Sequence, residues 1–145
     1  PAAHLGTLEN RVCDGVSDFD DLTALAALMH CLVVDLDTRA AAGEALPTMP
    51  PWHVQENKWR AARYGMDAIV VLDAESNERL VTDDLADLLT RLEPVAKRLG
   101  CVDELRSVDA ITRTGASYQR QREVARRTGG DLVAVVDSVV RELEL

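Results

Sequence analysis

The stretch Gly6–Asp14, which reads Gly-Thr-Leu-Glu-Asn-Arg-Val-Cys-Asp, decides how the rest of the chain is interpreted. Polar and apolar residues alternate along it, which predicts a β-strand over about residues 5–14. In that strand Glu9 and Arg11 share one face. They form either an ordinary ion pair worth about 0.2–1 kcal/mol, or the polar floor of a site in which the carboxylate holds a hard cation and the guanidinium binds an anion. Taken alone, the pattern favours the ion pair.

Amphipathic helices account for most of the remaining chain, because apolar residues recur there at three- and four-residue steps. Prolines, glycines and capping residues divide this pattern into segments. The expected helices cover about residues 18–42, 51–64, 82–99, 102–113, 117–128 and 131–143. Two short apolar runs around a turn-rich segment predict a β-hairpin over about residues 68–81.

These elements predict a helix-rich α+β fold with one sheet strand near the N-terminus and a small hairpin. The length of 145 residues suits one domain with a modest core. In the last helix we expect the apolar residues to face inward, and these are Leu132, Val135, Val136, Val139, Val140 and Leu143.

The charge balance limits the classes of partner. The chain has 25 acidic and 16 basic residues, which give a formal charge of −9. Binding to phosphate-rich partners draws on positive charge, so this balance argues against nucleic acid or an anionic membrane as the main partner. A nucleic-acid binder working through the basic cluster Arg120–Arg127 is disfavoured for the same reason. The longest apolar run, Ala24–Val34, is too short to cross a bilayer.

The three cysteines, Cys13, Cys31 and Cys101, have no paired or CxxC spacing. An odd, scattered set is typical of reduced thiols in the cytoplasm, which is the location we expect. The first residues lack the basic and apolar regions of a signal peptide. The histidines are isolated from one another, and no zinc pattern can be assembled from them by spacing.

Two later segments carry arginines that could bind an anion. In the predicted helix 51–64, Asn57 and Arg60 share a face and Arg63 lies next to it. These arginines are either a solvated flank, which composition alone favours, or a second wall of an anion site. Arg120 lies in the first turn of a later helix, where a cation opposes the helix dipole at a cost of about 0.3–1 kcal/mol. That cost has an explanation if the helix end faces an anion.

Three stretches together resemble a known enzyme family. The first is Gly6–Asp14 running into the alanine- and leucine-rich segment Asp21–Met29, the second is Glu56–Gly65, and the third is Gly115–Arg120. They resemble, in order and spacing, the carboxylate–amine ligase family, also called glutamate–cysteine ligase type 2, which has a glutamine synthetase-like fold. The resemblance covers nearly the whole chain.

The resemblance implies an enzyme that uses ATP and Mg²⁺ to activate a carboxylate as an acyl phosphate, which an amine then attacks. The substrates it implies are small amino acids, typically glutamate and cysteine. It implies that Glu9 is a metal ligand and that Arg11 is a catalytic residue that binds phosphate or the substrate carboxylate. The further residues it implies for substrate or phosphate binding are Asn57, Arg60, Arg63 and Arg120.

Ligases of this family are considerably longer than this chain. We therefore expect the 145 residues to be the C-terminal part of a single catalytic domain, with an incomplete active site and no activity alone. Its main partner is then the missing N-terminal segment of the same enzyme, and a homo-oligomer remains open. The alternative is a non-catalytic helical protein-binding module that keeps the ligase scaffold, because a fold does not fix a function.

Overall fold

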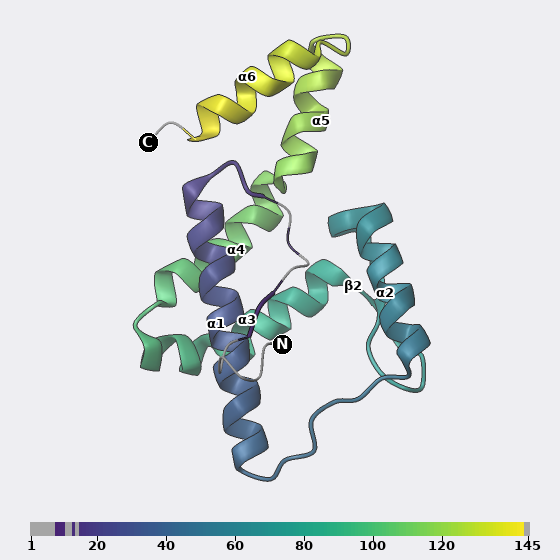
Figure 1. Cartoon of the computed structure of the whole chain (residues 1–145), viewed down its shortest axis with the longest axis vertical. Helices are drawn as coiled ribbons and strands as arrows, with labels where there is room; N and C mark the ends of the chain where they lie inside the picture. Colours follow the sequence, from purple (N-terminus) through teal and green to yellow (C-terminus); the bar gives the residue numbers. More distant parts are fainter. Residues whose placement is uncertain (1–7, 11–12, 14, 144–145) are drawn as a thin grey trace.

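Six α-helices and one β-hairpin make up residues 8–10, 13 and 15–143, the part of the chain that the computed structural model describes (Figure 1). The elements are α1 (Phe19–Ala41), α2 (Pro51–Tyr64), the 3₁₀ turn η2 (Gly65–Asp67), β1 (Ile69–Val71), β2 (Glu78–Leu80), α3 (Val81–Leu99), α4 (Val102–Thr114), α5 (Ser117–Arg127) and α6 (Leu132–Leu143). The helix-rich α+β character and the small hairpin are confirmed, and every helix end lies within one residue of its predicted position.

Local capping chemistry explains where the helices begin and end. The Asp18 carboxylate accepts hydrogen bonds from the backbone N–H groups of Asp20 (2.8 Å) and Asp21 (3.2 Å), which satisfies donors at the start of α1. Pro51 occupies the first turn of α2, where a missing N–H costs nothing. Gly100 ends α3 in the left-handed conformation at φ 74°.

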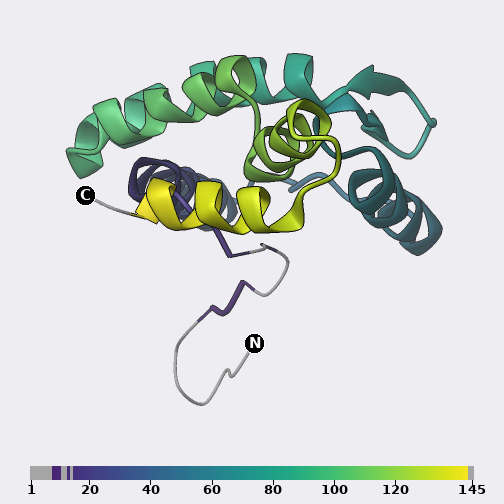
Figure 2. The same ribbon diagram turned by 90° about the horizontal axis from the view of Figure 1, so that it is seen from above.

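The hydrophobic core lies between α1, α3 and α4. In Figures 1 and 2 these three helices lie side by side, with α5 and α6 beyond one end and α2 with the hairpin beyond another. The buried core residues are Cys31, Leu92, Ala96 and Leu105. Half-buried leucines and valines from the same helices surround them. None of the helices in the described residues combines the length and apolar character that crossing a bilayer requires.

The predicted N-terminal strand is not found where it can be checked. Residues 8–10 and Cys13 are not in a strand, and the only strands within the described residues, β1 and β2, pair with each other. A strand needs a neighbour to accept and donate its backbone hydrogen bonds, and the described part of the chain provides none for this stretch. The remaining residues of the stretch, Arg11 among them, lie outside the described residues.

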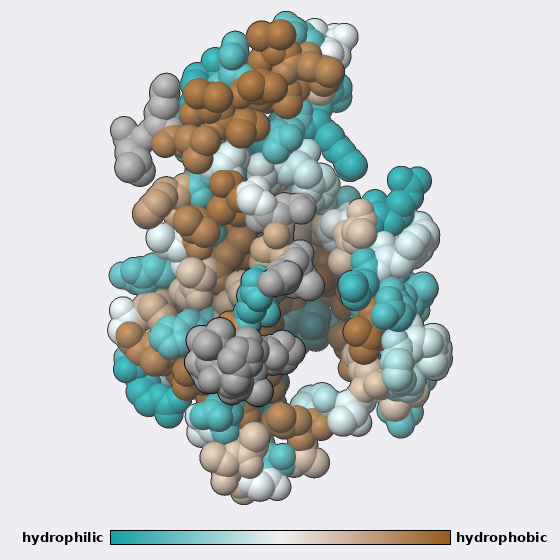
Figure 3. Space-filling view, viewed as in Figure 1, coloured by the Kyte–Doolittle hydropathy of each residue, from teal (hydrophilic) through white to brown (hydrophobic). Residues whose placement is uncertain are grey.

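The apolar face of α6 is largely exposed, as the brown patch over this helix in Figure 3 shows. The prediction that it faces inward is wrong for four of its six residues, Leu132, Val136, Val140 and Leu143, of which Leu132 is 73% exposed. Val135 and Val139 are half-buried. The reason is that α6 packs mainly on α5, whose sequence is strongly polar, while the core formed by α1, α3 and α4 is elsewhere.

Truncation of Leu92 tests the core assignment. Leu92 is fully buried between the three core helices. We expect Leu92→Ala to lower the free energy of unfolding by about 2–5 kcal/mol, because it removes packed methyl groups and leaves a cavity. Urea denaturation followed by circular dichroism measures this. The neighbouring exposed residue provides a control, since Arg91→Ala on the same helix should stay within about 0.5 kcal/mol. Equal effects of the two substitutions would contradict this core.

Candidate functional site

Arg60 joins α2 to both strands of the hairpin. Its Nε donates to Glu56 Oε1 at 2.8 Å, and its Nη1 donates to Ile69 O at 2.9 Å and to Glu78 Oε1 at 2.7 Å. These hydrogen bonds, with Glu56 first and then Glu78, raise the pKa of Arg60, so the guanidinium is held in its charged form. The predicted anion binder is thus paired with two carboxylates in this chain.

The other two predicted residues of α2 differ in their surroundings. The Asn57 side chain bonds the backbone of Val71 on β1 in both directions, with Val71 N–H donating to Oδ1 at 2.8 Å and Nδ2 donating to Val71 O at 2.7 Å. Asn57 therefore anchors the hairpin to α2. Arg63 lies exposed on the same helix.

Next to Arg60, a groove of about 390 Å³ opens between α2 and the hairpin, with the exposed rings of Trp59 and Tyr64 on its wall.

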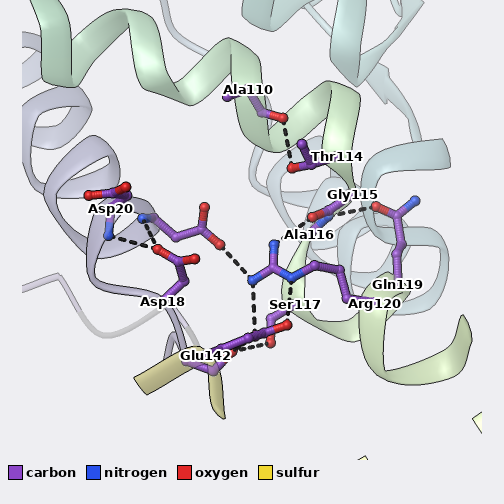
Figure 4. A network of polar contacts seen from close by, with 12 residues as sticks. Asp18, Asp20, Ala110, Thr114, Gly115, Ala116, Ser117, Gln119, Arg120 and Glu142 are labelled. Atoms are coloured by element: carbon purple, nitrogen blue, oxygen red, sulfur yellow. Dashed lines mark hydrogen bonds and ion pairs between the residues drawn. The ribbon is translucent and has the colours of Figure 1, made fainter. Parts of the chain in front are cut away.

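Arg120 is the centre of a polar network that connects α1, α5 and α6 (Figure 4). Its Nε donates to Glu142 Oε1 at 3.0 Å and its Nη2 donates to Asp21 Oδ2 at 2.9 Å. Its Nη1 donates to Gly115 O at 2.7 Å, at the end of α4. The Arg120 side chain is 21% exposed, so these pairs are partly shielded from water. One guanidinium therefore connects four parts of the fold, which are α1, the end of α4, α5 and α6.

Two serines extend this network. The Ser17 hydroxyl donates to Glu142 Oε2 and lies 3.1 Å from the Ser117 hydroxyl. Gln121 Nε2 donates to the Ser117 oxygen at 3.0 Å. Ser17 is buried, at 5% exposure, directly before α1. The network thus attaches the start of α1 to the start of α5 and to the last turn of α6.

The environment of Glu142 favours its ionised form. Burial opposes ionisation, but the hydrogen bonds donated by Arg120 and Ser17 outweigh it and hold the pKa of Glu142 below its usual range. The hydrogen bond to Glu142 also raises the pKa of Arg120, against the effect of burial. The carboxylate and the guanidinium therefore stay charged together at neutral pH.

Tyr118 connects the two arginine-bearing regions. Its hydroxyl accepts a hydrogen bond from Met66 N at 3.0 Å, and its ring covers Gly65, where a Cβ atom would overlap the phenol. Gly65 also adopts φ 56°, which side-chain-bearing residues rarely do. Gly65 ends the second of the family-like stretches and Tyr118 lies in the third. The structure therefore brings these two stretches into direct contact.

Two cavities are lined partly by residues of α5. One of about 470 Å³ lies between the N-terminal segment and α5, and its wall includes Cys13, Val16, Ser117 and Tyr118. A larger one of about 670 Å³ lies between α4, α5 and α6, where four arginines face two glutamates, namely Arg113, Arg120, Arg127 and Arg141 against Glu123 and Glu142. In a chain of charge −9, this concentration of guanidinium groups makes the larger cavity the best candidate for an anion.

The predicted metal ligand cannot be placed in a complete site. Glu9 is exposed, and no group of three or more potential ligands of the His, Cys, Asp or Glu type occurs among the residues that the structure describes. Mg²⁺ takes several oxygen ligands in octahedral geometry. The residues that the structure describes therefore do not form a self-contained magnesium site. Arg11, the predicted catalytic residue, lies outside the described residues.

Sequence reasoning proposed Arg120 as an anion-binding residue but did not identify the residues that contact it. Asp21 appeared only as the first residue of a family-like segment, and nothing in the sequence pattern marked Ser17 or Glu142 as partners of Arg120. The ion pair of Arg120 with Glu142 spans 22 residues and its pair with Asp21 spans 99. Helical spacing does not reveal such pairs. Tyr118 and Gly65 were inside the family-like stretches, which was the available clue.

Comparison with known proteins gives a consistent result. The family model for glutamate-cysteine ligase family 2 matches residues 1–138. A protein of Nocardioides sp. (strain JS614) named "Putative glutamate--cysteine ligase 2-3" is 79% identical over 143 residues, which are 99% of this chain and 38% of that protein. A protein of Mycobacterium ulcerans (strain Agy99) named "Putative glutamate--cysteine ligase 2" is 70% identical over 145 residues, covering 100% of this chain and 37% of that protein. The chain thus spans less than two fifths of the length of these relatives. No solved structure matches it.

Replacement of Arg120 tests the network. We expect Arg120→Ala to lower the free energy of unfolding by roughly 2–3 kcal/mol, because it leaves the partly buried Asp21 and Glu142 carboxylates without their cation. Thermal or urea denaturation measures this. Arg126→Ala on the same helix is the matched control, since that arginine is 72% exposed and its pair with Glu123 should contribute less than about 0.5 kcal/mol. An Arg120 effect no larger than the control would show that the network contributes nothing.

The pH dependence of stability tests Glu142 separately. Its pKa is lower in the folded chain than the value of about 4.3 for an unperturbed glutamate. Its contribution is therefore complete above that value and is lost as the pH falls through the folded pKa. We expect Glu142→Gln to flatten the loss of stability that urea denaturation records on acidification from about pH 5 to pH 3. Ser17→Ala removes one of the three hydrogen bonds that stabilise the carboxylate and should flatten the loss less. Unchanged acid profiles in both variants would contradict this role.

Proposed function

This chain belongs to glutamate-cysteine ligase family 2, and from that membership we propose that it forms part of an ATP-dependent carboxylate–amine ligase. The observation that carries the proposal is the family match over residues 1–138, together with relatives at 70–79% identity across essentially the whole chain. Because the chain spans 37–38% of those relatives, the activity is proposed for the complete protein.

The proposed reaction joins glutamate to cysteine in two steps. A carboxylate oxygen of glutamate attacks the γ-phosphorus of ATP and releases ADP, which forms an acyl phosphate. The amine of cysteine then attacks the acyl carbon, the carbon–oxygen bond to phosphate breaks, and an amide and inorganic phosphate result. Phosphoryl transfer of this kind depends on positioning and charge neutralisation more than on a protein nucleophile.

Arg11 and Glu9 have the proposed roles nearest the chemistry. A guanidinium can bind a carboxylate or phosphate with two parallel hydrogen bonds, which suits Arg11 as the group that neutralises developing charge. Mg²⁺, when bound, would neutralise phosphate charge and orient its oxygens. Glu9 would supply one ligand, and the other ligands would come from the part of the protein beyond this chain, since the described residues do not form a set of three.

The arginines of the helices support the site in two ways. Arg63 is exposed on α2 and remains our proposed substrate-binding residue there. Arg60 and Asn57 hold the hairpin against α2, so we assign them mainly to positioning. Arg120 is held by Asp21 and Glu142, and its proposed task is to fix the wall of the arginine-lined cavity while keeping it positive.

The exposed apolar surface supports the proposal that this chain alone does not contain the complete active site. The face of α6 and the α2 residues Trp52 and Trp59 are uncovered, with Trp52 62% and Trp59 56% exposed. Such patches normally mark contact surfaces. We propose that the rest of the enzyme is required for activity. A non-catalytic binding module would use the same surfaces for a different protein and would show no glutamate-dependent use of ATP.

Replacement of Arg11 tests the proposed function in the full-length protein. We expect Arg11→Ala to lower the turnover number about a hundredfold, equivalent to roughly 3 kcal/mol of lost transition-state stabilisation. The assay measures ADP release that depends on glutamate, cysteine and Mg²⁺, with the amide identified by mass spectrometry. Arg126→Ala, at an exposed surface ion pair, is the control and should keep normal turnover.

Two results would count against the proposal. Near-normal turnover of Arg11→Ala with an unchanged fold would remove Arg11 from the site. Absence of any ATP use that responds to glutamate in the unmodified protein would favour the binding module instead.

A further inference from the structure

Two cysteines that lie 70 positions apart in the sequence meet in the core. The Sγ atoms of Cys31 and Cys101 are 3.7 Å apart and share a weak hydrogen bond. Cys31 lies in the middle of α1 and is fully buried, whereas Cys101 is half-buried directly before α4. Sequence spacing predicted three unrelated thiols, so this juxtaposition comes entirely from the packing of α1 on the start of α4.

The surrounding structure keeps the two thiols together. Cys31 belongs to the buried core with Leu92 and Ala96, and Cys101 packs against that cluster. Both backbone polar groups of Cys101 are hydrogen-bonded. Its N–H donates to Ala96 O at 3.1 Å, and its C=O accepts from Leu105 N at 3.0 Å. A disulfide has a sulfur–sulfur length of about 2.05 Å, so the two sulfurs need to approach by less than about 2 Å. Rotation of two side chains can share that movement.

We propose that Cys31 and Cys101 form an oxidisable dithiol site whose reagent is a peroxide and whose product is a disulfide between α1 and the start of α4. Cys13, the third cysteine, is not part of this pair. It is exposed and lies on the wall of the cavity beside α5. The inference rests on the geometry of the core and does not depend on the proposed ligase activity.

The exposure of the two thiols gives the order of the reaction. Cys101 is the less buried of the two residues, so we assign the first attack on the peroxide to its sulfur. Its sulfur attacks one peroxide oxygen, the O–O bond breaks, and a sulfenic acid and one water form. The Cys31 sulfur then attacks the sulfenic sulfur, the S–S bond forms, the S–O bond breaks, and a second water leaves. Two thiols are oxidised by two electrons in total and the peroxide is reduced to water.

The buried partner is suited to the second step only. Burial raises the pKa of the Cys31 thiol to about 11, and the hydrogen bond with Cys101 acts in the same direction. Thiolates are the reactive form, so Cys31 does not compete for the oxidant. It acts instead because the core holds it next to the oxidised sulfur, where the effective concentration is high.

The disulfide would connect distant parts of the site-bearing fold. The closed loop contains α2, the hairpin and α3, and α1 carries Asp21, the partner of Arg120. Cross-linking a loop of this length restricts the unfolded chain. We therefore expect peroxide treatment to raise the melting temperature of the protein by roughly 10 °C, and dithiothreitol to reverse the rise.

Peptide mapping tests the proposal in the full-length protein. The protein is treated with hydrogen peroxide, free thiols are blocked with N-ethylmaleimide, and tryptic peptides are analysed without reduction. Cleavage after Arg11 and Arg39 places Cys13 and Cys31 in one peptide, residues 12–39, while Cys101 lies in residues 99–106. We expect these two peptides to be joined, with a mass lower than their sum by two hydrogen atoms.

Cysteine variants decide which sulfur is involved. The joined peptides should persist in Cys13→Ser and be lost in Cys31→Ala and Cys101→Ser. Alanine is chosen for Cys31 because it adds no polar group to the core. A cross-link that disappears in Cys13→Ser, or Cys101 oxidised to sulfinic acid while Cys31 remains alkylatable, would overturn the proposal. So would a cross-link only between separate molecules.

Discussion

The ion pairs of Arg120 hold together parts of the chain that have little hydrophobic reason to stay together. The apolar core unites α1, α3 and α4, but α5 is strongly polar and α6 exposes most of its apolar face. Contact of α5 and α6 with the rest of the described residues is therefore mainly polar, and at its centre one guanidinium binds Asp21 on α1 and Glu142 on α6. Partial burial makes these pairs stronger than surface pairs and makes the loss of either partner costly.

This arrangement has a consequence for the proposed site. Tyr118, two residues before Arg120, covers Gly65 and bonds the backbone of Met66. The same turn of α5 therefore contacts both the end of α2 and the start of α1. A polar centre of this kind suits the proposed site, which must stay charged and ordered.

Local signals allowed much of the fold to be predicted from the sequence. The Asp18 cap, Pro51 and Gly100 act through groups within a few residues, and the helix ends they mark agree with the structure. The failures have one physical cause, because each depended on a partner far away in the sequence. The strand near Glu9 needed a neighbouring strand, the α6 face needed a cover, and the contact between Cys31 and Cys101 needed the packing of two helices.

The same contrast between local signals and distant partners applies to the candidate site. Arg60, Arg120 and Asn57 were predicted to bind substrate or phosphate, and that stays a prediction, but their partners within the chain also give each of them a positioning role that spacing did not reveal. The resemblance implied the chemistry of the family, whereas the proposed contacts of Arg11 and Glu9 with a substrate concern the complete protein.

The fate of one oxygen atom tests the central claim most directly. In the full-length protein, glutamate labelled with ¹⁸O in its side-chain carboxylate is incubated with ATP, Mg²⁺ and cysteine, and the inorganic phosphate is analysed by mass spectrometry. An acyl phosphate transfers one labelled oxygen to phosphate for each amide formed. Formation of the amide with unlabelled phosphate, or hydrolysis of ATP without an amide, would contradict the account.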